Sequence, residues 1–444
     1  MDDHQHVQQP AVIEQSSTPT LPRRTDSGTL RSHIAGLSRA LHLLAWLAII
    51  AYVAFVAWEL GHGYAAAARG DRPLYTDYTS LYAASMLVQN DRPENLYVPR
   101  RMYQANVASA YAVYGDTINE AQARQAGFAP WMYPPTFILF AMPLAWLPYL
   151  PSFIAWIVAT AVPYLAAMRA IIPRRSSAVA FGLAAPPAFF NLAYGQTGFL
   201  SGGLIGLGLA RLQARPLAAG FWIGLASVKP HLGILIPVAL AAGGHWRAFA
   251  GAALTVVALI AVSIAVLGID PWYGFIGTTL FHIDGFDAGA YTWNSMTSIL
   301  SAAHLAGIPI ERAWTLQFTA AAFAALCVGV VWATGRRRPE TLGLQSAILC
   351  LATPLAIPMV YLYDLVIVVP AAAWIWMDMQ QRGARAYEIA ALVLSFAGLL
   401  TSFLIAARLS IQIGPALVAA LLAIALRRFI HALRTPLATA TSSA

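Results

Sequence analysis

The sequence is poor in charge and nearly devoid of lysine. Only 10% of its 444 residues are charged and 59% are hydrophobic, whereas a soluble globular protein is about one quarter charged. Apolar runs long enough to cross a bilayer recur along most of the chain. The ten-residue alternating segments of a membrane β-barrel are missing. We therefore expect an all-α polytopic membrane protein with about 11–13 membrane segments.

Several kinds of chemistry lack their usual residues. The two cysteines, Cys327 and Cys350, both lie in apolar runs and are expected to be small core residues, neither a disulfide nor a metal pair. The histidines show no metal-ligand spacing, and no phosphate-binding loop, dinucleotide fingerprint or nucleophile elbow is present. The net charge of +8 comes mainly from arginines in short loops, which is typical of orientation signals and does not indicate nucleic-acid binding.

The arginines predict how the chain is threaded. Residues 1–36 are polar and read as a disordered cytoplasmic tail, and the basic residues before a first span at about 37–58 place this end in the cytoplasm. Residues 37–430 are expected to form the membrane domain. Within it, residues 59–130 form a first outside loop with short helices along the membrane surface, and residues 269–312 form a second outside region. Residues 431–444 return to the cytoplasm as a C-terminal tail.

The middle of the chain admits more than one course. With the arginine-bearing loops in the cytoplasm, one segment between residues 131 and 171 has to be re-entrant. Residues 216–228 and 231–243 are either two short segments or one long span broken at Pro230. In both cases the chain around Lys229 is irregular backbone at membrane depth, which is tolerated only in a cavity or inside protein.

Acidic residues are absent from the long stretch between Glu120 and Asp270. Discarding the acids of the tail and of the arginine-bearing loops leaves the outside regions and Asp364, which lies near the end of an apolar run, where an acid is expensive. Asp77 in the first loop is, taken alone, a solvated or helix-capping residue. Its aromatic neighbours instead suit a lining that stacks sugars: Tyr75, Tyr78 and Tyr82.

Lys229 is the single lysine of the chain, against 26 arginines. It lies in an apolar region beside Pro230 and His231, where a cation needs an anionic partner. A bound phosphate is the favoured partner, and a snorkelling side chain is the alternative. Gln196 and Asn294 are polar groups able to donate hydrogen bonds to sugar hydroxyls or a diphosphate.

Taken in order, these short patches resemble the polyprenol-phosphate-sugar-dependent mannosyltransferases of glycosyltransferase family 87, within the wider GT-C class. The resemblance covers about residues 37–430. Its patches are Tyr75-Thr76-Asp77-Tyr78, Tyr82-Ala83-Ala84, Asn95-Leu96-Tyr97, Tyr133-Pro134-Pro135, Pro143 to Pro148, Gly195-Gln196, Lys229-Pro230-His231, Asn294-Ser295 and Pro354 to Asp364. At the last patch the family often carries a longer, histidine-bearing pattern, where this chain has Tyr361-Leu362-Tyr363-Asp364.

The resemblance implies a GT-C-like helical bundle with its active site on the extracytoplasmic side of the bacterial inner membrane and both termini in the cytoplasm. It implies an inverting transfer of mannose from a polyprenyl-phosphate donor to a lipid or glycan acceptor, without cofactor or metal. The family's catalytic acid maps to Asp77. Lys229 and His231 would then bind the donor phosphate, and the other substrate-binding residues would be Tyr75, Tyr78, Tyr82, Tyr133, Gln196, Asn294, Tyr363 and Asp364.

Other functions remain open at this point. A transporter or flippase of a lipid-linked sugar would show paired repeats and charges at mid-membrane and would tolerate loss of Asp77. A polysaccharide polymerase or ligase would carry large, arginine-rich outside loops. A membrane scaffold would not need the tyrosines and acids of residues 59–130. The partners expected are membrane lipids, the lipid-linked donor and the acceptor, with no nucleic acid.

Overall fold

The computed structural model describes residues 27–127, 130–287 and 292–435. The chain divides into two compact units, residues 1–44 and 45–444. Of the first unit, only the helical backbone from Ser27 and a few side chains are described. Helix α1 runs from the first unit into the second, and all later helices belong to the second unit.

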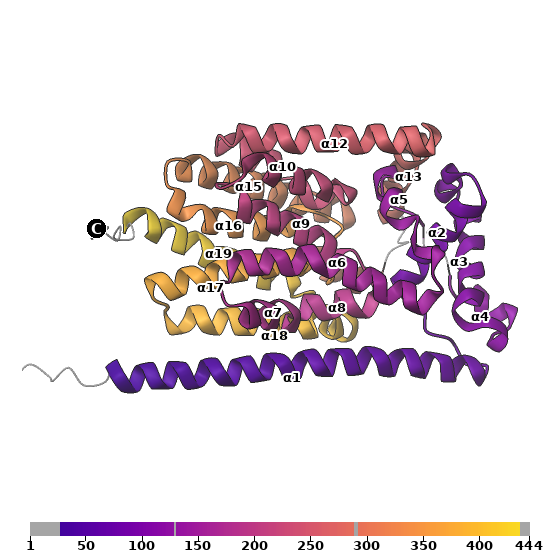
Figure 1. Ribbon diagram of the computed structural model, residues 1–444, viewed down its shortest axis with the longest axis horizontal. Coiled ribbons are helices and arrows are strands. Elements are labelled where there is room, and N and C mark those ends of the chain that lie inside the picture. Colours follow the sequence, from indigo (N-terminus) through magenta and orange to yellow (C-terminus); the bar gives the residue numbers. More distant parts are fainter. Residues whose placement is uncertain (1–26, 128–129, 288–291, 436–444) are drawn as a thin grey trace, which may run out of the picture. The chain divides into compact units, whose positions relative to one another are not determined.

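The described chain is helical, with one isolated β-bridge between Met296 and Tyr361 (Figure 1). Its N-terminal third comprises α1 (Ser27–Ala68), α2 (Asp77–Asn90), η1 (Pro93–Tyr97), α3 (Pro99–Tyr114), η2 (Gly115–Thr117), α4 (Glu120–Arg124), α5 (Pro135–Ala141) and η3 (Leu144–Trp146). The middle comprises α6 (Tyr149–Ile171), α7 (Arg175–Ala184), α8 (Pro186–Tyr194), α9 (Gly198–Arg211), α10 (Pro216–Leu225), η4 (Ala226–Val228), η5 (Pro230–Gly233), α11 (Ile236–Ala242) and α12 (Trp246–Leu267).

The C-terminal part comprises α13 (Asp270–Asp287), η6 (Trp293–Ser295), α14 (Ile299–Leu305), α15 (Ile310–Gly335), η7 (Pro339–Thr341), α16 (Leu342–Ala356), η8 (Asp364–Ile367), α17 (Val368–Arg382), α18 (Ala386–Leu409) and α19 (Gly414–Arg434). Many helices start with proline at their first position, for example α5, α8 and α10. Proline suits that position because the first amide of a helix has no intrahelical acceptor.

Six of the described helices are long and apolar enough to cross a membrane, so the chain is an integral membrane protein. They are His42–Ala68, Tyr149–Ile171, Trp246–Leu267, Ile310–Gly335, Ala386–Leu409 and Gly414–Arg434. Helices α7 and α8 together make a seventh candidate, bent by 67°. Four further apolar regions of the described chain are too short to count as spans: Pro135–Trp146, Gly198–Arg211, Pro216–Val228 and Pro230–Ala242. The fold is all-α and polytopic, as expected.

The N-terminal boundaries differ from those read in the sequence. Helix α1 already begins at Ser27, inside the predicted tail, and its apolar part runs to Ala68, ten residues past the predicted end. Four consecutive alanines, residues 65–68, favour a helix at its last turn. Residues 1–26 and 436–444 of the two predicted tails lie outside the described part. Helices α2, α3 and α4 confirm the prediction of helices within residues 59–130, and Figure 1 shows them together at one end of α6 and α12.

The segments left open by the sequence are short and broken. Helix α5 has seven residues, too few to cross a bilayer, so it is the short member of the pair between residues 131 and 171. Helices α10 and α11 flank a break at Lys229 and Pro230. Residues 357–363 are also non-helical before η8. These last two breaks bring the polar side chains of Lys229 and Asp364 into the interior.

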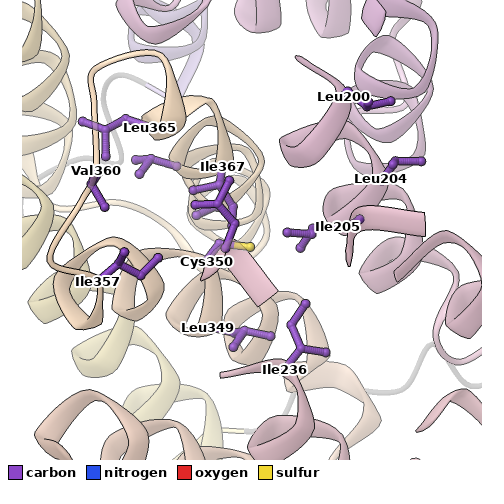
Figure 2. Close-up of a cluster of buried hydrophobic side chains, with 14 of the residues drawn as sticks. Leu200, Leu204, Ile205, Ile236, Leu349, Cys350, Ile357, Val360, Leu365 and Ile367 are labelled. Carbon is purple, nitrogen blue, oxygen red and sulfur yellow. The ribbon is translucent and has the colours of Figure 1, made fainter. Parts of the chain in front are cut away.

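Aliphatic side chains from distant parts of the sequence form the core behind these breaks. Figure 2 shows members of this core from α9 (Leu200, Leu204 and Ile205), α11 (Ile236), α16 (Leu349 and Cys350) and the following segment (Ile357, Val360, Leu365 and Ile367), with Ile205 extending toward Cys350. Both cysteines are free, with Cys350 fully buried and Cys327 half-buried, as expected of core residues. Apolar side chains therefore pack against one side of the non-helical segment 357–363. Its polar groups lie on the other side.

Candidate functional site

Asp77 is the first residue of α2, and a carboxylate is favourable there because the helix dipole is positive at this end. The capping position itself is Thr76, whose side chain does not bond the helix and instead lies 3.4 Å from the Tyr149 hydroxyl. Asp77 Oδ2 accepts a hydrogen bond of 2.9 Å from Gln196 Nε2, 119 residues away. Asp77 is thus a tertiary contact as well as a helix-terminal residue.

Gln196 is held in one orientation by the groups around it. Its Oε1 accepts hydrogen bonds from the Tyr133 hydroxyl at 2.9 Å and from the Thr197 amide at 3.1 Å. With the amide oxygen so occupied, the amide nitrogen, which can only donate, points to Asp77. Gln196 is 7% exposed. It follows Gly195, which ends α8 in the left-handed region with φ of +67°.

Lys229 pairs with Asp364. Its Nζ donates to Asp364 Oδ1 and, at 3.2 Å, to Thr197 Oγ1. The two ionic residues are 6% and 2% exposed. Asp364 also accepts from the Tyr361 amide at 3.1 Å. The partner that Lys229 requires is therefore supplied within the chain by a residue 135 positions away, which the sequence could not indicate.

Backbone breaks place both members of this pair. Proline at position 230 disfavours a helical conformation at Lys229, whose φ of −133° is extended, so the chain cannot continue α10 and the side chain enters the interior. On the opposite side, Asp364 opens η8. Gly198 allows this loop to approach, since a Cβ at residue 198 would lie 2.1 Å from the Tyr363 carbonyl oxygen.

Tyrosine rings surround the lysine and the aspartates. The Lys229 Nζ lies 5.1 Å from the ring centre of Tyr363 and 5.8 Å from that of Tyr133, both within reach of a cation–π interaction. Tyr363 stacks on Tyr361 at 5.3 Å and meets Tyr194 edge to face at 6.1 Å. Tyr194 is 39% exposed, so an aromatic surface leads from solvent or lipid to the buried charges.

Burial raises the pKa of the Asp77 carboxyl above its ordinary value, since little water reaches it to stabilise the charge. Hydrogen bonds from Gln196 and Tyr363 and the positive charge of Lys229 act in the opposite direction, while the charge of Asp364 adds to the increase. The residue as a whole keeps partial exposure. The Asp77 carboxylate therefore binds a proton more readily than a solvent-exposed aspartate does, and part of the residue remains accessible.

His231 lies close enough to Lys229 and Asp364 to interact with their charges. Its Nε2 atom is buried and has no hydrogen-bond partner. An unsatisfied buried polar atom is costly, so this nitrogen is available for a ligand. Among the residues that the structure describes, no three His, Cys, Asp or Glu side chains gather as a metal ion would require.

The structure thus brings together most of the residues singled out in the sequence: Asp77, Tyr133, Gln196, Lys229, His231, Tyr363 and Asp364. The structure does not bring the Asn294 side chain to these residues: its backbone carbonyl accepts from Gln412 at 3.4 Å, and it is Met296, two residues further on, that pairs with Tyr361. Thr197, Tyr194 and Tyr361 were not singled out. Their only signal was their position beside Gln196 and Tyr363.

The tyrosines around Asp77 lie differently from the expected sugar-stacking lining. Tyr78 and Tyr82 are one helical turn apart, on a face of α2 that points to α6, and their hydroxyls bond Ser152 at 2.5 Å and the Leu147 carbonyl at 3.0 Å. Tyr75 donates to the Gln122 carbonyl and packs on Tyr114. The structure does not bring these three rings to the Asp77 carboxyl. They support α2 and the neighbouring loop, and the aromatic surface near Asp77 comes from Tyr133, Tyr194 and Tyr363.

Comparison with known proteins adds one finding. The family model described as glycosyltransferase family 87 matches residues 131–358, more than half of the chain. No curated protein and no solved structure matches. Gln196, Lys229 and His231 lie inside the matched range, while Asp77 and Asp364 lie outside it and fold back onto it through Gln196 and Lys229.

Proposed function

Because the chain belongs to glycosyltransferase family 87, we propose that it transfers a sugar, mannose, from a polyprenyl-phosphate donor to a lipid or glycan acceptor on the extracytoplasmic side of the bacterial inner membrane. The observation that carries the proposal is the contact of Asp77 with Gln196 beside the buried Lys229. The carboxyl group of Asp77 has a raised pKa and feels the charge of Lys229, and Lys229 in turn lies close to the imidazole of His231, whose Nε2 has no partner. These are the groups that a displacement at a sugar phosphate needs.

Asp77 acts as the general base. Its ionised carboxylate takes the proton of an acceptor hydroxyl while the hydroxyl oxygen attacks the anomeric carbon, and the bond from that carbon to the phosphate oxygen breaks with its electron pair going to the phosphate. The configuration at the anomeric carbon is inverted. A pKa above the usual aspartate value makes Asp77 a stronger base once ionised, and Gln196 holds the carboxylate in one orientation.

Lys229 and His231 receive the phosphate. The leaving polyprenyl phosphate gains negative charge in the transition state, and a fixed cation in a dry site stabilises that charge more than water does. His231 Nε2 offers a buried hydrogen-bonding atom without a partner. Asp364 forms an ion pair with Lys229 in the structure. It therefore serves as the internal counter-ion, which the donor phosphate displaces.

The first experiment compares the purified chain with Asp77→Asn and Asp77→Glu variants. Each is incubated in detergent with a panel of polyprenyl-phosphate sugars and candidate acceptors, and released polyprenyl phosphate is measured by mass spectrometry. Asp77→Asn keeps the shape and the bond to Gln196 but cannot take a proton, so we expect transfer to fall by at least 100-fold. Asp77→Glu should recover part of the rate.

Folding is the control for this test. Because burial raises the folded-state pKa of Asp77, ionising it costs stability as pH rises from the unfolded-state value through the folded-state value. Asparagine carries no such cost, so the variant should unfold at or above the parent's temperature at neutral pH. Parental turnover in a folded Asp77→Asn variant would refute the base assignment. Translocation of the lipid-linked sugar without transfer would support a flippase instead.

A further inference from the structure

A second group of buried charges lies at the other end of α17. It consists of Asp378, Arg382, Glu388, Arg427 and Arg428, here called the Arg428 cluster. Helix α17 starts at Val368, just after η8, and its rise from Val368 to Asp378 is about 15 Å. The cluster is therefore independent of the transfer chemistry.

Arg428 is the centre of the cluster. Its Nε donates to Asp378 at 2.7 Å, its Nη1 to both Glu388 oxygens at 3.0 and 2.9 Å, and its Nη2 to the Gly383 carbonyl at 2.9 Å. Arg382 Nε donates to Asp378 at 3.0 Å, and Arg427 pairs with Glu388. All three nitrogens of the Arg428 guanidinium thus donate hydrogen bonds, and each acid is shared between two arginines.

The charges in the cluster do not balance. Three guanidinium groups share two carboxylates, which leaves one formal positive charge. The Arg382 and Glu388 side chains are only 4% and 0% exposed. Two nitrogen atoms, Arg382 Nη2 and Arg427 Nε, are buried without a hydrogen-bond partner. Buried donors without an acceptor are costly. Arg427 is the exposed member of the cluster, so an anion that reaches it would offset the excess positive charge and accept a hydrogen bond from its Nε.

We propose that the Arg428 cluster binds the phosphate group of an anionic lipid. It lies where α18 begins and α19 ends, and both are candidate membrane spans. Arg427 is 37% exposed and lies 5.3 Å from the ring centre of Tyr387, which is itself 50% exposed. Exposed tyrosine beside arginine is typical of the membrane–water interface, and basic pockets between spans suit lipid head groups.

The source of the phosphate follows from this position. Arginine presents a planar pair of donors that matches phosphate oxygens. At the end of two spans, the phosphate groups at highest concentration are those of the lipids themselves. The bound group is therefore expected to be a phosphodiester with a net negative charge, as in phosphatidylglycerol, and not a zwitterionic head group or free phosphate.

The experiment uses the full chain purified in detergent. Retained lipid is measured by native mass spectrometry and the unfolding temperature by fluorescence, with phosphatidylglycerol, phosphatidylcholine or inorganic phosphate added. Arg427→Gln is the test variant, because Glu388 keeps both bonds from Arg428 and the fold should survive. Arg434→Gln, an exposed arginine in the last turn of α19, is the matched control with the same loss of charge.

We expect phosphatidylglycerol to bind and stabilise the parent and Arg434→Gln, and to bind Arg427→Gln about tenfold more weakly. Arg427→Lys keeps the charge but lacks the Nε donor, so its affinity for phosphatidylglycerol should lie between those of the parent and Arg427→Gln. It also serves as the test variant if Arg427→Gln does not fold. If phosphatidylglycerol binding were weakened equally in Arg427→Gln and Arg434→Gln, the loss of surface charge alone would explain the effect and the proposal would be overturned. Equal stabilisation by inorganic phosphate or phosphatidylcholine would overturn the assignment to an anionic lipid.

Discussion

At the scale of single residues, the candidate site consists of a few polar groups whose charges and hydrogen bonds act on one another. Asp77, Lys229 and Asp364 carry one net negative charge between them, and the hydrogen bonds of Gln196 and Thr197 orient Asp77 and Lys229. Removing any one of these groups changes the charge felt by the others. The consequences therefore have a definite sign and can be tested one residue at a time.

The pH dependence of transfer follows from the raised pKa of Asp77. The base must be ionised, so kcat/KM should rise with pH through a pKa above the ordinary aspartate value. The hydrogen bond from Gln196 lowers that pKa, so Gln196→Ala should move the acidic limb to higher pH as well as reduce the rate. The measurement is kcat/KM against pH for the two proteins, and an unmoved limb in the variant would contradict the role of Gln196.

Asp364 should oppose phosphate binding, since it both occupies Lys229 and repels an anion. Asp364→Asn is expected to tighten the binding of a polyprenyl phosphate about tenfold, while Lys229→Met should weaken it by at least as much. Binding is measured by tryptophan fluorescence or calorimetry. Weaker binding in Asp364→Asn would make Asp364 a residue that positions Lys229. Unchanged binding in Lys229→Met would remove the lysine from the phosphate site.

At the scale of helices and loops, the site is built where helices stop. Three breaks, at Gly195, at Lys229-Pro230 and at residues 357–363, bring Gln196, Lys229 and Asp364 together. Glycine and proline marked the first two breaks in the sequence, so irregular chain at membrane depth was predictable there. The third break lies in a stretch of mostly apolar residues, where the sequence holds a weaker signal.

Close packing of α9 against the third break makes one glycine critical. An added Cβ at Gly198 would lie 2.1 Å from the Tyr363 carbonyl and 2.8 Å from Asn191 Oδ1, so the loop that carries Asp364 would have to move. Gly198→Ala should therefore cost about 1–3 kcal/mol of stability and most of the activity. Gly61→Ala, at a helical position with no atom within 4 Å, is the control and should be neutral or slightly stabilising.

At the scale of the whole molecule, the sequence predicted the class of fold better than the contacts within it. Composition and apolar runs indicated an all-α membrane protein, and the structure confirms it. The pairing of Lys229 with Asp364 spans 135 positions, and a single sequence holds no signal for a contact at that distance. The side-chain orientation of Tyr78 and Tyr82 could not be predicted either, since it depends on where α6 packs against α2.

The orientation of the molecule in the membrane is the remaining prediction, and the arginines set it. Basic loops such as Arg336 to Arg338, after α15, are expected in the cytoplasm, and α3, within residues 59–130, on the extracytoplasmic side. Tyr111 on α3 and Arg337 are both exposed, so cysteines introduced there report the two sides.

A membrane-impermeant maleimide should label Tyr111→Cys in intact spheroplasts and Arg337→Cys only after the membrane is opened. The parent chain is the background control, since Cys350 is buried and Cys327 half-buried inside candidate or apolar helices. The reverse pattern would place the Asp77 end of α2 in the cytoplasm. It would then require a donor on that face, so it would overturn the extracytoplasmic transfer while leaving the chemistry of the site intact.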